Sequence, residues 1–354
     1  MNDPLDQLGP ERRRRAADLL NQAGLVAPLR WAALRGGANN QAFRVDAPGR
    51  SVLLKAYFVH ADDPRDRLRA DHGFASFSWA HGVRTSVRPL ACDAPGQLAL
   101  FEYLNGVKLT PAEVTWPRVR EALDFYLSVN AHRHAAEARA LPPAAEACFT
   151  LREHLDCLRR RLARLRFLDV TTPVDREAAA LVRGELSDQS EALFQQLDAE
   201  AAAFGVAPEE AVAEEDRCLS PSDFGFHNAL RTGDGRLRFF DFEYAGWDDP
   251  GKLVADFFCQ PECPVPGRFF EPFAVMIAQR TTRPEWHLRR FRLLLPVYRL
   301  KWCCILLNDF LPAGEGRRRF ARGSGAEERK AEQLRKARAA LHGETPADRW
   351  RLVA

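Results

Sequence analysis

The feature that most constrains this chain is the stretch 219–247, in which two acidic motifs flank a short hairpin. Asp223 precedes Asn228 by five residues, and Asp241 begins an Asp-Phe-Glu motif thirteen residues beyond Asn228. Between the motifs, two short strand-like runs are joined by Gly-Asp-Gly at 233–235, a turn sequence typical of β-hairpins. The hairpin would therefore bring the two motifs together at one site.

This combination of motifs suits phosphoryl transfer. The reaction needs an Asp that accepts the hydroxyl proton, and an Asn and an Asp that hold Mg²⁺ on the phosphates. Asp223, Asn228 and Asp241 are the candidates for these three tasks. An Asp and an Asn at this spacing are common by chance, but the hairpin and the second motif make the whole pattern specific.

Length and composition fit a soluble protein with two lobes. The 354 residues can build two lobes of ordinary domain size, and the hydrophobic content of 46% is typical of a globular protein. The formal net charge of +3 gives no general reason to expect nucleic acid or a membrane as partner. The arginine clusters at 12–15 and 317–319 are interpreted as solvated helix faces, and no nucleic-acid reader motif is recognisable.

The eight cysteines are interpreted as reduced thiols of a cytoplasmic protein. Their spacing is irregular, and the polar, arginine-rich N-terminus does not resemble a secretory signal. Cys259 and Cys263 could in principle bind zinc together with Cys303 and Cys304, but nothing specifies the ligand geometry. The most apolar helix, expected over 287–311, carries several Arg and Lys residues, which argues against a transmembrane span. Nothing in the sequence specifies an oligomeric state.

The most strand-like part of the chain, residues 29–58, predicts three strands with a glycine loop between the first two. The loop contains Gly36, Gly37 and Asn40, and small residues there would let backbone N–H groups approach a triphosphate. Lys55 lies in the third strand among apolar neighbours, where its ammonium group could reach the phosphates. Taken alone, the glycines could form a plain hairpin turn and Lys55 could face solvent.

A helix is expected over 63–82, with Asp63 as its N-cap and Pro64 in its first turn. Asp71 lies on the apolar stripe of this helix. A carboxylate in that position is costly unless it is paired, and Lys55 is its natural partner. The alternative is an exposed Asp71 at the edge of the helix.

A further strand is expected over 98–104, followed by a hinge at Asn105 and Gly106 between the two lobes. Adenine would be bound at this hinge by backbone N–H and C=O groups. Glu102 and Leu104 are the candidate positions for these contacts.

From residue 117 onward the sequence patterns are mainly helical, and a short amphipathic helix is also expected over 10–24. The later helices are expected over 117–130, 151–165, 174–205, 252–258, 287–311 and 326–342. Thr150 and Glu153 form a capping box, and Pro296 is expected to kink or divide its helix. The acidic stretch 209–216 is interpreted as a solvated loop, and the last helix as charged and peripheral.

Taken in order, these motifs resemble the aminoglycoside phosphotransferase and choline kinase-like superfamily of small-molecule kinases. The resemblance covers about residues 28–260 and includes the Trp-Asp-Asp-Pro run at 247–250 and Asp256. It implies an α+β, two-lobe protein-kinase-like fold. The small antiparallel β N-lobe would span 1–104, and the larger, mainly α-helical C-lobe would span 105–354.

The resemblance also implies roles for the motif residues. Asp223 would be the catalytic base, with Asn228 and Asp241 as Mg²⁺ ligands. Lys55, held by Asp71, would be the cation on the phosphates. ATP would be the phosphoryl donor, and the acceptor would be a hydroxyl group of a small sugar, amino sugar or amino alcohol.

Three positions depart from the family pattern or extend it. Pro221 stands where the family usually has His, two residues before the catalytic Asp, and Asp71 stands where Glu is usual. The metal motif ends in Glu243 instead of Gly, which argues against a protein kinase and could add an outer-sphere or second-metal contact. Pro221 is the one feature that favours the alternative, a pseudokinase that binds nucleotide or acts as a scaffold without turnover.

The sequence leaves the acceptor open. If the arginines near the expected acceptor helices face the cleft, an anionic or neutral sugar-like acceptor is favoured; they are Arg283, Arg289, Arg290 and Arg292. If Trp247, Tyr298 and Trp302 form an aromatic cage, a choline-type acceptor is favoured instead. A role in the core is the alternative for these aromatic residues.

Overall fold

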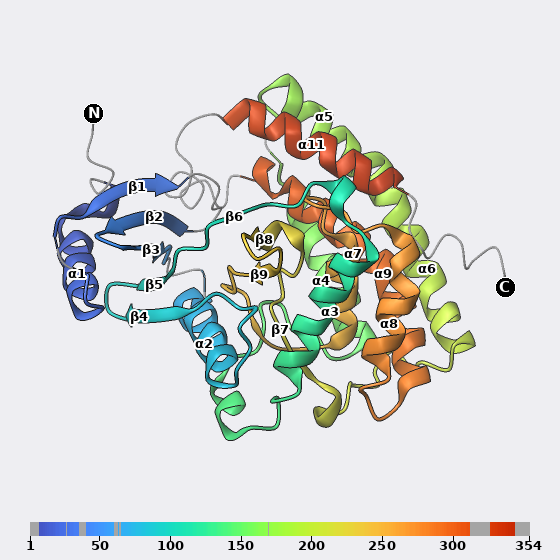
Figure 1. Cartoon of the computed structure of the whole chain (residues 1–354). Coiled ribbons are helices and arrows are strands. Elements are labelled where there is room, and N and C mark those ends of the chain that lie inside the picture. The colour runs from blue at the N-terminus through green and yellow to red at the C-terminus, as the bar shows by residue number, and fades with distance from the viewer. Residues whose placement is uncertain are drawn as a thin grey trace.

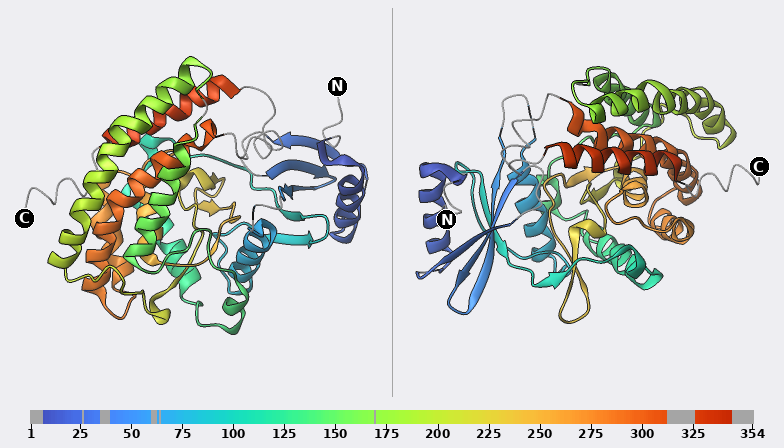
Figure 2. Two further views of the ribbon diagram at one scale, coloured as in Figure 1. Left: turned by 180° about the vertical axis from the view of Figure 1, so that it is seen from behind. Right: turned by 90° about the horizontal axis from the view of Figure 1, so that it is seen from above.

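The computed structural model describes residues 7–25, 27–34, 40–59, 63, 65–168, 170–311 and 326–343. It has the predicted α+β architecture, with a small lobe built on an antiparallel sheet and a larger, mainly helical lobe (Figures 1 and 2). The division of the chain at residue 104 stays a prediction.

The N-lobe sheet has five strands in the order β1-β2-β3-β5-β4, and each neighbouring pair is antiparallel. The strands are β1 Arg30–Leu34, β2 Asn40–Ala47, β3 Arg50–Tyr57, β4 Pro89–Asp93 and β5 Leu98–Glu102. Four of them lie where the sequence predicts strands. Strand β4 was not predicted, because it begins at a proline and its register shifts between Pro89 and Ala91, so it lacks a regular alternation.

Two helices cover opposite faces of this sheet (Figure 2). Alternating residues of β3 explain the arrangement: Val52 and Leu54 pack in the same cluster as α1 (Gly9–Gln22), while Leu53 packs in the cluster that contains residues of α2 (Arg67–Ala80). Strand β3, at the centre of the sheet, is therefore covered on both faces.

The start of α2 differs from the prediction. Asp66, not Asp63, is the N-cap, and its carboxylate accepts a hydrogen bond of 2.9 Å from the backbone N–H of Arg69. Asp63 instead pairs with the guanidinium groups of Arg65 and Arg67. Both aspartates lie just before the residues with helical periodicity, so the sequence pattern alone could not decide which of them is the N-cap of α2.

The C-lobe is arranged around the long helix α9 (Pro284–Leu307), which includes Pro296 without being divided. Its other α-helices are α3 Trp116–Asn130, α4 Leu151–Leu165, α5 Pro173–Leu181, α6 Ser187–Ala203, α7 Pro250–Cys259, α8 Phe270–Ala278 and α11 Ala326–His342. The predicted capping box opens α4, because Thr150 and Glu153 bond to each other's backbone N–H groups.

The single helix expected over 174–205 is interrupted in the structure. A π-helical turn, Val182–Leu186, separates α5 from α6, and Gly184 within it has non-helical dihedral angles of φ −100° and ψ −110°. A glycine has the backbone freedom that this break requires. The periodic apolar pattern continues through the break, which is why the sequence suggested one helix.

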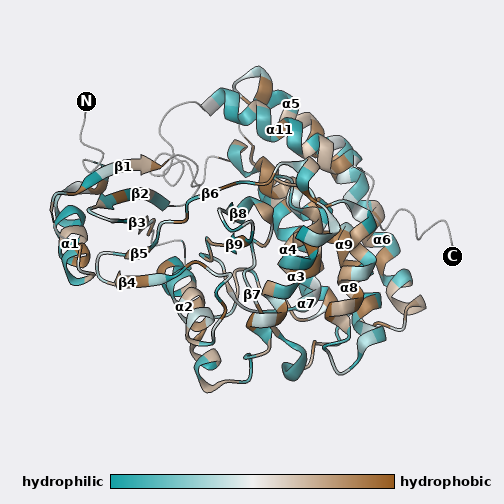
Figure 3. Cartoon of the chain, viewed as in Figure 1, coloured by the Kyte–Doolittle hydropathy of each residue, from teal (hydrophilic) through white to brown (hydrophobic). Residues whose placement is uncertain are grey.

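The last helix, α11, is mainly hydrophilic, as Figure 3 shows. It is nevertheless packed on the C-lobe, because Leu334, Ala337 and Leu341 are buried in the same cluster as residues of α9. In the part of the chain that the structure describes, no helix is both long and apolar enough to cross a membrane.

The acidic stretch 209–216, expected to be solvated, ends in a buried carboxylate. Asp216 accepts hydrogen bonds from the backbone N–H and the hydroxyl of Thr282, and its Oδ2 lies 3.0 Å from Nε2 of His287. Thr282 lies between α8 and α9 and His287 lies in the first turns of α9, both far from Asp216 in the sequence. The local acidic composition could not reveal them.

Two small sheets carry the motifs of the stretch 219–247. The predicted hairpin is formed by β8 (Ala229–Thr232) and β9 (Leu237–Phe239), and β6 (Gly106–Val107) adds to its edge. Strand β7 (Cys218–Ser220), directly before Asp223, pairs with β10 (Gly246–Asp248), directly after the Asp-Phe-Glu motif. The start and the end of the stretch are thereby held side by side.

Candidate active site

The predicted partnership of Lys55 and Asp71 is present in the structure. Lys55 projects from β3, and its Nζ lies 2.5 Å from Oδ2 of Asp71 on α2. Both side chains are buried, with exposed fractions of 5% and 0%. The alternatives of a solvent-facing Lys55 and an exposed Asp71 are therefore wrong.

Asp71 is held by two further hydrogen bonds. The hydroxyl of Tyr57 donates to Oδ2 over 2.8 Å, and the backbone N–H of Phe242 donates to Oδ1 over 2.9 Å. The second bond connects α2 in the N-lobe to the Asp-Phe-Glu motif in the C-lobe. A shorter carboxylate than the usual Glu thus reaches partners in both lobes.

Lys55 has a second carboxylate partner, because its Nζ lies 2.6 Å from Oδ1 of Asp241. Burial alone would lower the pKa of Lys55, but the negative charges of Asp241, Asp71 and Glu243 raise it above its ordinary value. The lysine is therefore a fixed cation. Asp241 itself has a φ of +67°, a left-handed conformation that a non-glycine residue adopts only when its surroundings impose it.

Asp223 lies in the loop after β7, and its neighbours hold it from two sides. His227 Nε2 lies 3.1 Å from Oδ1, and the amide nitrogen of Asn228 donates to the backbone oxygen of Asp223 at 3.0 Å and to Oδ2 at 3.3 Å. Burial raises the pKa of Asp223, but His227 and Asn228 outweigh burial and lower the pKa below its ordinary value. The carboxylate is ionised at neutral pH and can accept a hydrogen bond from a hydroxyl group.

His227 lies beside Asp223 and is not among the predicted site residues. Burial lowers its pKa, but the adjacent carboxylate of Asp223 raises the pKa above its ordinary value. Gly225 makes room for the ring, since a Cβ atom at this position would lie 2.7 Å from Nδ1 of His227. The sequence signal that could have indicated His227 is Gly225, two residues before it. The reason for a glycine there becomes clear only from the position of the ring.

The donor set of Asn228 and Asp241 fits Mg²⁺, which prefers oxygen ligands. The amide nitrogen of Asn228 is directed at Asp223, so its carbonyl oxygen points the other way. Within the described residues, no group of three or more His, Cys, Asp or Glu side chains could hold a metal by itself. Mg²⁺ commonly uses one or two protein oxygens and completes its coordination with phosphate oxygens and water.

Glu243 lies next to this donor set but is engaged elsewhere. It is buried, and its Oε2 accepts a hydrogen bond of 3.1 Å from the amide nitrogen of Asn40. The same oxygen lies 3.9 Å from Nε of Arg67. Asn40, expected in the phosphate loop, is thus a second connection between the lobes. A metal contact of Glu243 stays a prediction.

The remaining predicted nucleotide positions are placed as follows. Gly36 and Gly37 lie outside the described residues. Glu102 at the end of β5 accepts a hydrogen bond of 2.7 Å from the backbone N–H of Arg88 and pairs with Arg238 of the hairpin. Leu104 packs against the large hydrophobic cluster at the junction of the lobes. Adenine recognition by this backbone segment stays a prediction.

The four arginines whose orientation would indicate the class of acceptor are each bonded to other groups of the protein. Arg290 is buried against Asp249, while Arg283 pairs with Glu210. The other two pairings are Arg292 with Glu271 and Arg289 with Glu285 and the backbone oxygen of Phe204. All four arginines therefore have protein partners, and the preference for an anionic or neutral sugar-like acceptor stays a prediction.

The three aromatic residues of the suggested cage have separate partners as well. Tyr298 is buried with its hydroxyl 2.9 Å from Nδ1 of His154, which supports the alternative of a core role. The indole N–H groups of Trp247 and Trp302 donate to the backbone oxygen of Ala138 and to Asp256. A choline-type cage gains no support from this arrangement.

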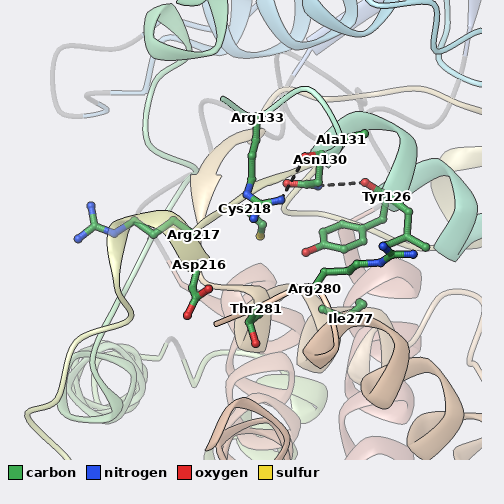
Figure 4. A pocket seen from close by; sticks show the side chains of 11 residues that line it. Tyr126, Asn130, Ala131, Arg133, Asp216, Arg217, Cys218, Ile277, Arg280 and Thr281 are labelled. Carbon is green, nitrogen blue, oxygen red and sulfur yellow. Dashed lines mark hydrogen bonds between the residues drawn. The ribbon is translucent and has the colours of Figure 1, made fainter. Parts of the chain in front are cut away.

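A cavity of about 270 Å³ lies beside β7, lined by residues of α3, β7 and α8 (Figure 4). None of the predicted site residues lines it. Its Asn130 bonds to both backbone groups of Leu219: Oδ1 accepts from the N–H at 2.8 Å, and the amide nitrogen donates to the C=O at 2.9 Å. Asn130 thereby fixes the strand that leads into the Asp223 loop.

Sequence comparison with protein families gives a single clear result. Residues 30–291 match the model described as the phosphotransferase enzyme family. No functionally curated protein matches the sequence.

Several solved structures share the fold. A choline kinase from Cryptosporidium parvum Iowa II is 14% identical, with 91% of this chain and 93% of that chain covered and a TM-score of 0.53. A choline/ethanolamine kinase family protein from Mesorhizobium loti is 17% identical, with 95% of each chain covered and a TM-score of 0.54. A spectinomycin phosphotransferase, solved with ADP and spectinomycin, is 9% identical, with 92% of this chain and 98% of that chain covered and a TM-score of 0.53.

Proposed function

The chain belongs to the phosphotransferase enzyme family, and on that premise we propose that it transfers the γ-phosphoryl group of ATP to a hydroxyl group of a small metabolite, with Mg²⁺ on the phosphates. The observation that carries the proposal is the network of Lys55, Asp71 and Asp241, in which Lys55 and Asp71 are buried and Asp241 is half-buried. In this network the ammonium group of Lys55 lies within hydrogen-bond distance of both carboxylates, which supports a role of Lys55 as phosphate cation beside Asp241 as metal ligand. A protein with no use for bound phosphate has little reason to bury this charge.

The described residues can divide the chemistry between them. Asp223 would orient the acceptor hydroxyl toward the γ-phosphorus and take its proton as the new O–P bond forms. Lys55 would neutralise charge on the phosphate oxygens. Asn228 and Asp241 would hold Mg²⁺, which supplies further neutralisation of the phosphates. Catalysis would rest on positioning and electrostatics, since none of these residues needs to form a covalent intermediate.

For the acceptor we propose a sugar, amino sugar or amino alcohol. The names of the similar structures include choline, ethanolamine and spectinomycin, and each of these compounds carries a hydroxyl group. The arginines that would have favoured an anionic acceptor are engaged with protein carboxylates or backbone. We therefore give neutral and cationic hydroxyl compounds precedence over anionic ones.

The first test is thermal unfolding with and without MgATP. A ligand at a hundredfold excess over its Kd stabilises a protein by about 2.7 kcal/mol, which corresponds to about 4 °C for a chain of this length. We expect this shift in the wild type and its loss in Asp241→Ala. Asp234→Ala, a carboxylate removed from the exposed hairpin turn, is the matched control and should retain the shift. No shift of the wild type with MgATP would refute the proposal.

The second test is turnover. ADP release should rise with one compound of a panel of sugars, amino sugars and amino alcohols, and Asp223→Asn should lose this activity while it retains the MgATP shift. A wild type that binds MgATP but transfers no phosphoryl group to any compound or to water would be a nucleotide-binding scaffold, the alternative that Pro221 favours.

A further inference from the structure

The Asp223 loop has an unusual construction directly before the carboxylate. Pro221 occupies the position where the resembling family usually has His, and a proline has no side-chain polar atom and no backbone N–H with which to anchor the loop. Ser222 follows with a φ of +65°, in the left-handed region that a serine rarely adopts. The backbone N–H of Asp223 turns back onto the oxygen of Pro221 at 2.9 Å. A loop of this kind keeps its shape only if something outside it holds it.

Lys252 on α7 supplies such a hold. Its Nζ donates a hydrogen bond of 2.8 Å to the hydroxyl oxygen of Ser222. The lysine is 1% exposed and Ser222 is buried too. A charge-assisted hydrogen bond away from water is stronger and more directional than one at the surface. The residue adjacent to the proposed base is therefore tied to a rigid helix.

Lys252 is itself fixed by two carboxylates. Its Nζ lies 2.5 Å from Oδ2 of Asp248, at the end of β10, and 3.6 Å from Oδ2 of Asp256, one turn further along α7. Burial lowers the pKa of Lys252, but these carboxylates raise it above its ordinary value, so the lysine is charged. Asp248 is paired across the small sheet with Cys218 of β7.

These contacts form a closed ring around the loop. The chain runs from β7 to Ser222, whose hydroxyl accepts a hydrogen bond from Lys252. Lys252 forms an ion pair with Asp248, and Asp248 lies on β10, which pairs with β7. Ser222 is held at one side of this ring, and the peptide bond from Ser222 fixes the point from which the Asp223 side chain projects. The positive charge of Lys252 also lowers the pKa of Asp223.

We propose that Lys252 is a positioning residue for the catalytic base: through the hydroxyl of Ser222 it holds the Asp223 carboxylate in line with the acceptor hydroxyl, in place of the histidine that Pro221 replaces. The inference rests on the proposed function, because it assigns Asp223 the role of base. It requires no contact between Lys252 and the substrates.

The test compares three variants by turnover and by MgATP binding. Ser222→Ala removes only the hydroxyl, at a position whose conformation is equally strained for both residues. Lys252→Met combined with Asp248→Asn removes the cation together with its closest counter-charge. The second carboxylate near Lys252, Asp256 at 3.6 Å, keeps the hydrogen bond that it accepts from the indole N–H of Trp302. Lys330→Met is the matched control, since Lys330 forms a 2.8 Å pair with the buried Asp175 between α11 and α5.

Turnover is measured as ADP formation from MgATP in the presence of the pooled hydroxyl compounds. This readout also counts transfer of the phosphoryl group to water. We expect kcat to fall about tenfold to hundredfold in Ser222→Ala and in the Lys252 and Asp248 double variant, as for a small misplacement of a reacting group. The KM for MgATP should stay within about twofold of the wild-type value, and the thermal shift caused by MgATP should stay within about 1 °C of the wild-type shift. Loss of a purely structural contact would lower Tm but would not lower kcat at an unchanged KM. Lys330→Met should behave in this way, with a lower Tm and wild-type turnover.

Each result decides something. Wild-type turnover in Ser222→Ala and in the double variant would overturn the positioning role and leave the proposed function intact. Loss of MgATP binding together with turnover in Ser222→Ala would also overturn it, because the effect would then lie on the nucleotide. Absence of the MgATP shift in the wild type would refute the proposed function, and this inference with it.

Discussion

Asp71 offers the sharpest test of the network that joins the lobes. Its carboxylate accepts hydrogen bonds from Lys55, Tyr57 and the backbone N–H of Phe242, and it is fully buried. Replacement by asparagine keeps the shape of the side chain but turns one acceptor oxygen into an NH₂ group. Whichever way the amide is turned, that group faces at least one donor.

The size of the effect follows from these contacts. Loss of one partner of a buried ion pair costs about 3–5 kcal/mol, and Lys55 keeps Asp241 as its remaining carboxylate. A protein of 354 residues has an unfolding entropy of about 0.7 kcal/mol per kelvin. Asp71→Asn should therefore lower Tm by about 4–7 °C.

The assay is thermal unfolding at neutral pH, monitored by two probes that report on secondary and tertiary structure. Asp93→Asn is the matched control in the same lobe, because Asp93 forms a partly exposed pair of 3.3 Å with Arg15. Such a pair is worth about 0–1 kcal/mol, so its loss should shift Tm by less than about 2 °C. If Asp71→Asn and Asp93→Asn unfold at the same temperature, the network does not stabilise the protein as reasoned.

Three further outcomes are expected. Burial lowers the pKa of His154 to about 4, so the unfolded chain binds a proton at this residue that the folded protein does not. The contribution of neutral His154 to the free energy of unfolding is fully present above about pH 6.5, and about 3 kcal/mol of it is lost between pH 6.5 and pH 4. Tm measured over that range should fall less steeply in His154→Gln. In Gly246→Ala the new Cβ would lie 2.1 Å from a backbone oxygen, and we expect a loss of at least about 3 kcal/mol, whereas Gly233→Ala, with nothing within 4 Å, should unfold like wild type. Asn130→Ala leaves the backbone groups of Leu219 without their side-chain partner and should lower the unfolding free energy, measured by denaturant titration, by about 2–5 kcal/mol; an unchanged midpoint would contradict the anchoring role of Asn130.

Local signals in the sequence predicted most of the elements that surround the site. The Gly-Asp-Gly turn marked the β8–β9 hairpin, and Thr150 with Glu153 marked the start of α4. The pairing of Lys55 with Asp71 could be predicted as well, because a carboxylate on an apolar helix stripe demands a cation and one lay on the preceding strand. Each of these inferences depends on residues close together in the chain or on a charge that must be balanced.

The rest depends on partners that are distant in sequence. Nothing near Asp216 indicates that Thr282 and His287 will enclose it, and nothing near Ser222 indicates the ammonium group of Lys252. The arginines of α9 show the same limit, because a charged residue on a helix can face a cleft or a carboxylate, and only packing decides which. Strand β4 was missed for a local reason, since its proline and its shifted register hide the alternation that marks a strand.

Two hydrogen bonds directly after Asp241 restrict how the halves of this protein can be recombined. The backbone N–H of Phe242 donates to Asp71 and the carboxylate of Glu243 accepts from Asn40, so the residues that follow Asp241 are matched to side chains of the N-lobe. An N-lobe grafted from a relative would remove the Asn40 partner of the buried Glu243 and the acceptor of the buried backbone N–H of Phe242 unless it brought equivalents of Asn40 and Asp71. In the evolution of this chain, Asn40 and Glu243 would then have to change together, as a pair that crosses the boundary between the lobes, whereas Asp71 requires only the backbone N–H of residue 242.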